Sequence, residues 1–142
     1  FLVLVLPAAA LTLIAGTLIL DVPLTLSPWL LVVIPLTGTA LCGLGALIGI
    51  SMRTPEDVGS TSSLITFLLL GLGPIVIPPD RLPGAILTLS YLSPATYAAS
   101  ALRQTVLGLS DTIPLGVDIA ALAVLLVVSL WAVGQRMDWR ES

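Results

Sequence analysis

The sequence contains no histidine, no lysine and a single cysteine, Cys42, among its 142 residues. Without histidine, the chain lacks the ligand sets of zinc sites and the base that activates a serine or cysteine nucleophile. It also has no G-x-x-x-x-G-K-[ST] phosphate-binding loop, so we expect no ATP binding within these residues. We therefore expect a chain that is not an enzyme and that carries no catalytic residue, metal or cofactor of its own.

Charged residues are also scarce, because they make up 9% of the chain while hydrophobic residues make up 57%. A soluble domain usually carries about a quarter charged residues, which cover its water-exposed surface. The composition therefore predicts that a lipid bilayer contacts most of this surface. The five basic residues are all arginine and form no basic patch, so nucleic acid is not an expected partner.

Long segments without any charge separate the few charged positions. A helix needs roughly 20 apolar residues to cross the hydrocarbon core of a bilayer. The sequence therefore predicts an all-α integral membrane protein with a single transmembrane domain over residues 1–142. The predicted spans cover residues 1–20, 28–50, 62–77 and 115–134.

The second and third spans are joined by a short polar connection. Thr54 has the character of an N-cap residue, and Pro55 suits the first turn of a helix. Glu56 then places a carboxylate near the positive end of the helix dipole. We interpret Arg53 to Glu56 as a turn that restarts a helix at once. Ser27 and Pro28 give a similar signal for the start of the second span.

The segment 82–107 differs from the spans because prolines divide it. Pro83 and Pro94 mark the starts of two apolar pieces, about 84–92 and 94–107. Each piece has at most about 14 residues, which is too short to cross a bilayer. Ser93 is a candidate N-cap for the second piece, and Tyr97 has the polar tip that favours a membrane–water boundary. The pattern predicts a re-entrant helical hairpin that enters one leaflet before the last span.

Arg103 is a charge inside an otherwise apolar segment. An ionisable residue in such a place is a functional candidate. It could instead extend to the outer membrane interface, or pair with Asp80 or Asp111. We hypothesise that Arg103 fixes the hairpin against the last span.

Gly45 and Gly49 form a G-x-x-x-G pair in the second span. This spacing lets two helix backbones approach closely in lipid. The pair is consistent with ordinary packing inside the subunit or with a contact between two subunits, and the sequence leaves both readings open.

The arginines indicate an orientation. Four spans and one hairpin place both chain ends on one side of the membrane, together with the connection at residues 51–61. That side carries Arg53, Arg136 and Arg140, whereas the other side carries Arg81 and Arg103. The positive-inside rule therefore predicts a cytoplasmic C-terminus.

Three segments, in their order and spacing, carry a resemblance to a known family. They are residues 71–83, 92–97 and 101–103, and they contain Asp80, Arg81, Pro83, Ser93, Pro94, Tyr97 and Arg103. Together they resemble the C-terminal part of ABC transporter permeases of the type-two export class, which includes drug, antibiotic and polysaccharide exporters. Residues 49–56 resemble the short cytoplasmic turn of that family. Ser93 stands where asparagine is common in the family.

The resemblance implies a permease subunit in the cell membrane that moves an amphipathic, lipid-linked or polysaccharide substrate out of the cytoplasm. It implies two permease halves, a second copy or a paralogue, each bound to a cytoplasmic ABC ATPase that hydrolyses ATP. It also implies six spans, of which the last four are present here and the N-terminal spans are missing. The alternative is a non-transporting structural subunit of a membrane complex.

Overall fold

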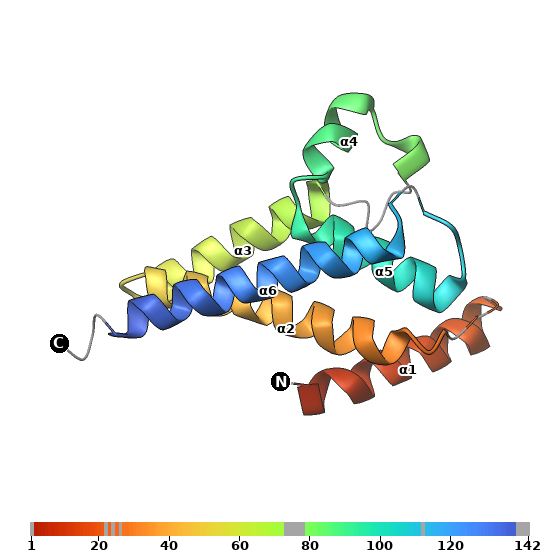
Figure 1. Cartoon of the computed structure of the whole chain (residues 1–142), viewed down its shortest axis with the longest axis horizontal. Helices are drawn as coiled ribbons and strands as arrows, with labels where there is room; N and C mark the ends of the chain where they lie inside the picture. Colours follow the sequence, from red (N-terminus) through yellow and green to blue (C-terminus); the bar gives the residue numbers. More distant parts are fainter. Residues whose placement is uncertain are drawn as a thin grey trace.

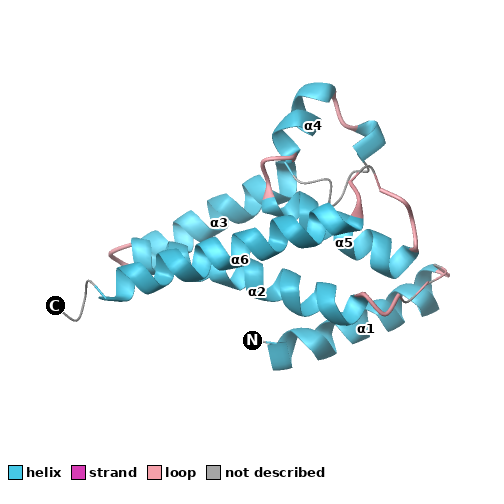
Figure 2. Ribbon diagram, in the orientation of Figure 1, coloured by secondary structure: helices cyan, strands magenta, loops and turns pink. Residues whose placement is uncertain are grey.

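The computed structural model describes residues 2–21, 23, 25, 27–72, 79–111 and 113–138, and in these residues all regular structure is helical. The prediction of an all-α chain is therefore confirmed. The elements are α1 (Leu2–Leu20), α2 (Leu30–Ser51), α3 (Pro55–Leu72), the 3₁₀ helix η1 (Pro79–Arg81), α4 (Gly84–Ser90), α5 (Pro94–Leu107) and α6 (Leu115–Asp138) (Figures 1 and 2).

Two of these helices are long and apolar enough to cross a membrane. They are α2, over Leu30–Ser51, and the part of α6 over Leu115–Arg136. The apolar part of α1 that the structure describes, Val3–Ile19, is shorter than a usual span. The third predicted span, 62–77, begins earlier than expected, at Pro55, and residues 73–78 lie outside the described residues.

The centre of the fold is the contact between α2 and α6, which lie side by side (Figure 1). The buried residues of α2 recur every three or four positions, so they share one helical face. They are Val33, Thr37, Ala40 and Gly43. A Cβ atom added at Gly43 would lie 3.0 Å from the Cβ of Ser129 on α6, so the two backbones approach closely at this point.

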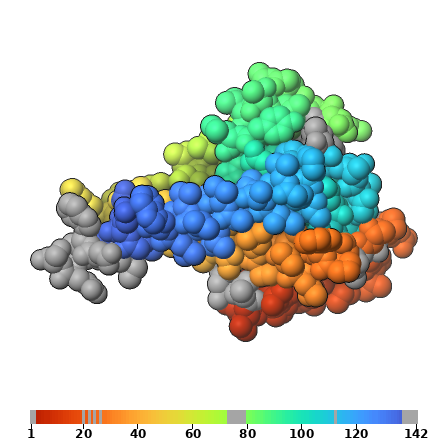
Figure 3. Space-filling view, viewed as in Figure 1, coloured from red at the N-terminus to blue at the C-terminus, as the bar shows by residue number. Residues whose placement is uncertain are grey.

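Large apolar side chains cover much of the outside. Phe67 of α3 is 74% exposed, and Val127 and Trp131 on the outer face of α6 are 65% and 64% exposed. Figure 3 shows that α6 lies on the surface along the length of the molecule. Soluble proteins rarely expose contiguous apolar surface on this scale, so lipid is the solvent that suits it.

Contacts at the two ends of the α2–α6 pair show which loops lie together. At one end, the loop before α2 pairs with the end of α5, because Thr25 N donates to Val106 O over 3.0 Å and Ser27 N donates to Thr105 O over 3.1 Å. At the other end, Arg136 Nη1 donates to Ser51 Oγ over 2.9 Å. The end of α6 therefore lies beside the turn between α2 and α3.

One predicted helix start is wrong by two residues. Helix α2 begins at Leu30, not Pro28, because Ser27 and Pro28 form a turn in which Leu30 N donates to Ser27 O over 2.9 Å. The signal at Thr54 and Pro55 is confirmed, since α3 begins at Pro55 and Asp57 N donates to Thr54 Oγ1 over 3.1 Å.

Candidate functional site

Helix α5 and its surroundings contain most of the residues that the sequence singled out. The helix begins at Pro94 with Ser93 as its N-cap residue, as predicted. It ends at Gly108, whose φ of 63° is left-handed and favours glycine. The Thr25 side chain also fills the space that a Cβ at Gly108 would need. Both ends of α5 are therefore defined by local backbone chemistry.

The turn between α4 and α5 is fixed by two side-chain hydrogen bonds. Tyr97 OH donates to the carbonyl oxygen of Tyr91 over 2.8 Å, and the hydroxyl of Thr96 donates to the carbonyl oxygen of Ser90. Ser93 Oγ is buried nearby without a hydrogen-bond partner among the described residues. The hydroxyl group of Tyr97 therefore helps to fix the conformation of this turn. Pro83 immediately precedes α4.

Arg103 forms an ion pair with one of the two carboxylates considered for it. Its Nη1 atom lies 2.8 Å from Asp111 Oδ2, and the side chains are 21% and 8% exposed, respectively. Asp111 lies in the loop between α5 and α6, so the pair joins α5 to that loop and not to α6 itself. Asp80 and Arg81 are exposed residues of η1.

The contact between α5 and α6 is made instead by Gln104 and Asp118, which the sequence analysis did not bring together. Gln104 Nε2 lies 2.9 Å from Asp118 Oδ2, 2.8 Å from Ile113 O and 3.1 Å from Ser100 Oγ. We call these four residues the polar bridge. The signal in the sequence was faint, because Gln104 is one of several polar residues of α5 and Asp118 lies at the start of an apolar helix.

Asp118 is the least solvated charged residue described in the chain. Its side chain is fully buried, and Oδ1 has no hydrogen-bond partner among the described residues. Buried carboxylates are stable only when neighbouring groups donate hydrogen bonds to them. Gln104 and Ser100, both on α5, are therefore the side-chain donors that support this carboxylate, and removing the Gln104 amide would leave it with one of them.

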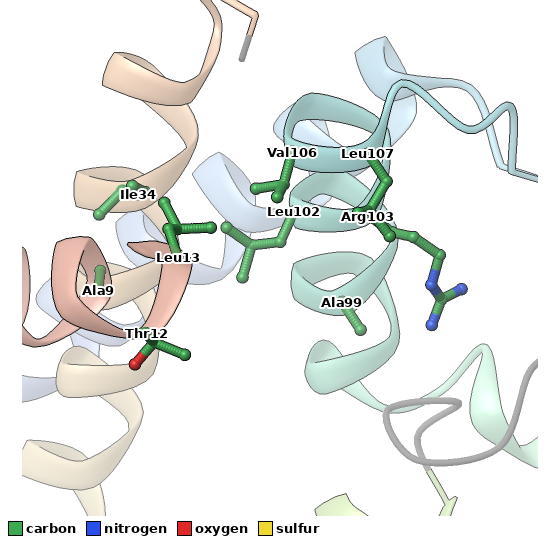
Figure 4. Close-up of a pocket in the computed structure, with 9 residues that line it drawn as sticks. All are labelled: Ala9, Thr12, Leu13, Ile34, Ala99, Leu102, Arg103, Val106 and Leu107. Atoms are coloured by element: carbon green, nitrogen blue, oxygen red, sulfur yellow. The ribbon is translucent and has the colours of Figure 1, made fainter. Parts of the chain in front are cut away.

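On another side of α5 lies an apolar groove of about 460 Å³ between α1, α2 and α5. Figure 4 shows Leu13 of α1 directed toward Leu102 and Val106 of α5, whereas the guanidinium group of Arg103 is directed away from them. The lining offers no reactive group. It suits the apolar part of an amphipathic molecule or a lipid chain. The groove is lined by Ala9, Thr12, Leu13, Ile34, Ala99, Leu102, Arg103, Val106 and Leu107.

The two glycines of the G-x-x-x-G pair do not make the close approach between α2 and α6. A Cβ added at Gly45 or Gly49 would meet nothing within 4 Å, whereas Gly43 packs against Ser129. Packing of the pair inside the subunit is therefore not seen among the described residues. A contact of Gly45 and Gly49 with another subunit stays a prediction.

The predicted turn Arg53, Thr54, Pro55 and Glu56 is exposed at the end of α2 where α6 also ends. Arg136 lies close to it through its hydrogen bond to Ser51. Arg140, the other arginine expected on this side, lies outside the described residues. This end of the molecule therefore carries exposed charges, as η1 does with Asp80 and Arg81.

A sequence model of the ABC-2 type transporter family matches residues 1–107, which include α1 to α5. The chain belongs to the ABC-2 type transporter family. The predicted resemblance is thereby confirmed, and the protein is a membrane permease component of an ABC transporter. The matched region of this ABC-2 permease ends with α5, so Asp118 lies beyond it. No curated protein and no solved structure matches the chain.

Proposed function

We propose that this ABC-2 permease moves a small amphipathic, lipid-linked or polysaccharide substrate out of the cytoplasm. The match to the ABC-2 family over residues 1–107 carries the proposal. The apolar groove beside α5 supports an amphipathic substrate, because an apolar pocket binds the matching part of a ligand by shape. In this role the chain binds and releases the transported substrate and performs no covalent chemistry.

Energy for transport comes, in this proposal, from ATP hydrolysed by a separate cytoplasmic ATPase. The exposed turn from Arg53 to Glu56, beside the end of α6, is the surface that we assign to this partner. A second permease copy or a paralogue completes the transporter. The exposed Gly45 and its neighbour Gly49 support this pairing, because small residues allow close helix contacts in lipid.

We also propose that the chain crosses the membrane four times, with α1, α2, α3 and α6 as spans and α4–α5 as a re-entrant hairpin. Helices α4 and α5 have 7 and 14 residues, which is too short for a crossing. The end of α5 lies beside the loop that precedes α2, and α6 begins nearby. The hairpin therefore enters and leaves at one end of the bundle.

Labelling of single cysteines tests this topology. We expect Ser110→Cys, in a Cys42→Ser background, to react with a membrane-impermeant maleimide in intact cells. Glu56→Cys, in the same background, should react only after the membrane is opened, because the C-terminal side is cytoplasmic in this proposal. Both positions are exposed, so a difference in reaction reports the side of the membrane. Reaction of Glu56→Cys in intact cells would show that the orientation is reversed.

Reconstitution with an ATPase partner tests the function. We expect the purified complex, in lipid nanodiscs, to hydrolyse ATP faster when amphipathic compounds from a defined panel are added. The matched control is the same complex with the phosphate-loop lysine of the ATPase replaced. A stable membrane complex that contains this chain and no ATPase would instead support the structural subunit.

A further inference from the structure

The polar bridge is the side-chain connection between α5 and the first turn of α6. Gln104 Nε2 reaches Asp118 Oδ2 over 2.9 Å, and the rest of the contact is formed by small or apolar side chains. Asp118 Oδ1 is buried without a partner among the described residues. A buried carboxylate oxygen without a donor is unfavourable. In the closed bridge, one carboxylate oxygen of Asp118 therefore has no hydrogen bond. When the bridge opens, hydration of Asp118 would offset part of the free energy lost with the Gln104–Asp118 hydrogen bond.

Space for α5 to move lies beside the part of the helix that contains Leu102 and Val106. The face of α5 toward α2 and α6 is formed by small residues, among them Ala95, Ala98 and Ala101, which lose little contact area when helices separate. The groove of about 460 Å³ between α1 and α5 lies beside Leu102 and Val106. A shift of α5 into this groove would separate Gln104 from Asp118.

Two further polar connections of α5 run to loops. The Arg103–Asp111 ion pair joins α5 to its own following loop. The backbone hydrogen bonds of Thr105 and Val106 join it to the loop that precedes α2. None of these contacts involves α6, so the loops can accompany α5.

We propose that the polar bridge is a latch that closes α5 onto α6 in the resting permease and opens when ATP is bound by the partner ATPase. Opening moves α5 toward the groove and exposes the α5 face that contains Ala101 to water. This inference rests on the proposed transport function. It adds a positioning role for Gln104 and Asp118.

The test measures the reactivity of one buried position in the complete transporter. Ala101→Cys is placed in a Cys42→Ser background, because Ala101 is fully buried and Cys42 is exposed. N-Ethylmaleimide reacts with thiolate, which forms only where water reaches the sulfur. We expect labelling of Ala101→Cys to be roughly tenfold faster with ATP and vanadate than without nucleotide, as for a locally opened segment. Ser110→Cys is the control, because it is exposed and should react equally in both states.

Variants of the bridge separate a latch from a merely structural contact. Gln104→Leu should give fast labelling of Ala101→Cys without nucleotide, because it removes the closing hydrogen bond. Asp118→Asn keeps an acceptor for Gln104 and should retain the dependence on nucleotide. Equal, slow labelling in both nucleotide states while ATP hydrolysis continues would overturn the latch.

The same experiment distinguishes failure of the latch from failure of the proposed function. If no ATPase complex can be formed, the proposed transport function fails, and labelling of the Gln104→Leu variant still decides whether the bridge closes α5. Fast labelling of that variant supports the latch, and slow labelling overturns it.

Discussion

Replacing Gly43 by leucine will lower the thermal midpoint of the detergent-solubilised permease. The new Cβ would lie 3.0 Å from Ser129 Cβ and 3.6 Å from Ser129 Oγ, at the close approach of α2 and α6. Inserting a side chain into a packed contact typically costs about 1–3 kcal/mol. Differential scanning fluorimetry of the purified protein measures the change.

Two other glycines of the same helix provide matched controls for this substitution. A Cβ at Gly45 or Gly49 meets nothing within 4 Å, so Gly45→Leu and Gly49→Leu should leave the thermal midpoint of the monomeric protein, in which the proposed subunit contact is absent, close to that of the parent protein. An equal loss of stability at all three positions would show that α2 packs on α6 through a different face.

Removing the amide of Gln104 will have the other large effect. Gln104→Leu removes one of the two side-chain donors of the fully buried Asp118 and leaves only Ser100, so we expect a loss of about 1–3 kcal/mol in the free energy of unfolding. Asp118→Leu removes the carboxylate as well as its desolvation penalty. The double variant should therefore be more stable than the sum of the single changes predicts, with a coupling energy of about 1–3 kcal/mol. Unfolding in mixed micelles of detergent and SDS measures all three variants.

Arg103→Ala serves as a comparison for the Gln104 and Asp118 variants. Its ion pair with Asp111 is largely buried, with side chains 21% and 8% exposed, and removing one partner of a buried pair costs about 3–5 kcal/mol. We therefore expect Arg103→Ala to lower the free energy of unfolding at least as much as Gln104→Leu does, but without coupling to Asp118→Leu. Additive effects of Gln104→Leu and Asp118→Leu would contradict a specific interaction between these two side chains.

The local signals in the sequence predicted two helix starts correctly. Thr54 and Pro55 begin α3, and Ser93 and Pro94 begin α5. These positions are readable because capping and proline geometry depend on neighbouring residues alone. Ser27 and Pro28 gave the same signal and misplaced the start of α2, since a turn with a similar backbone precedes that helix.

The contacts between helices could not be read in the same way. Gln104 and Asp118 are separated by a loop whose path determines whether they meet. The sequence also did not show which small residues of α2 pack against α6. Gly45 and Gly49 have the better-known spacing, yet α6 covers the face that contains Gly43. Which face is covered depends on tertiary packing, and no pattern within α2 alone reveals it.

Helices α2 and α6 are joined near both ends and in the middle. Arg136 contacts Ser51, Gly43 adjoins Ser129, and Val33 belongs to the same core as Leu122. With a rise of about 1.5 Å per residue, the two helices form a packed pair roughly 30 Å long. A displacement at Ser51 would therefore be passed to the adjoining end of α6 through Arg136, and the two helices would move as a packed pair.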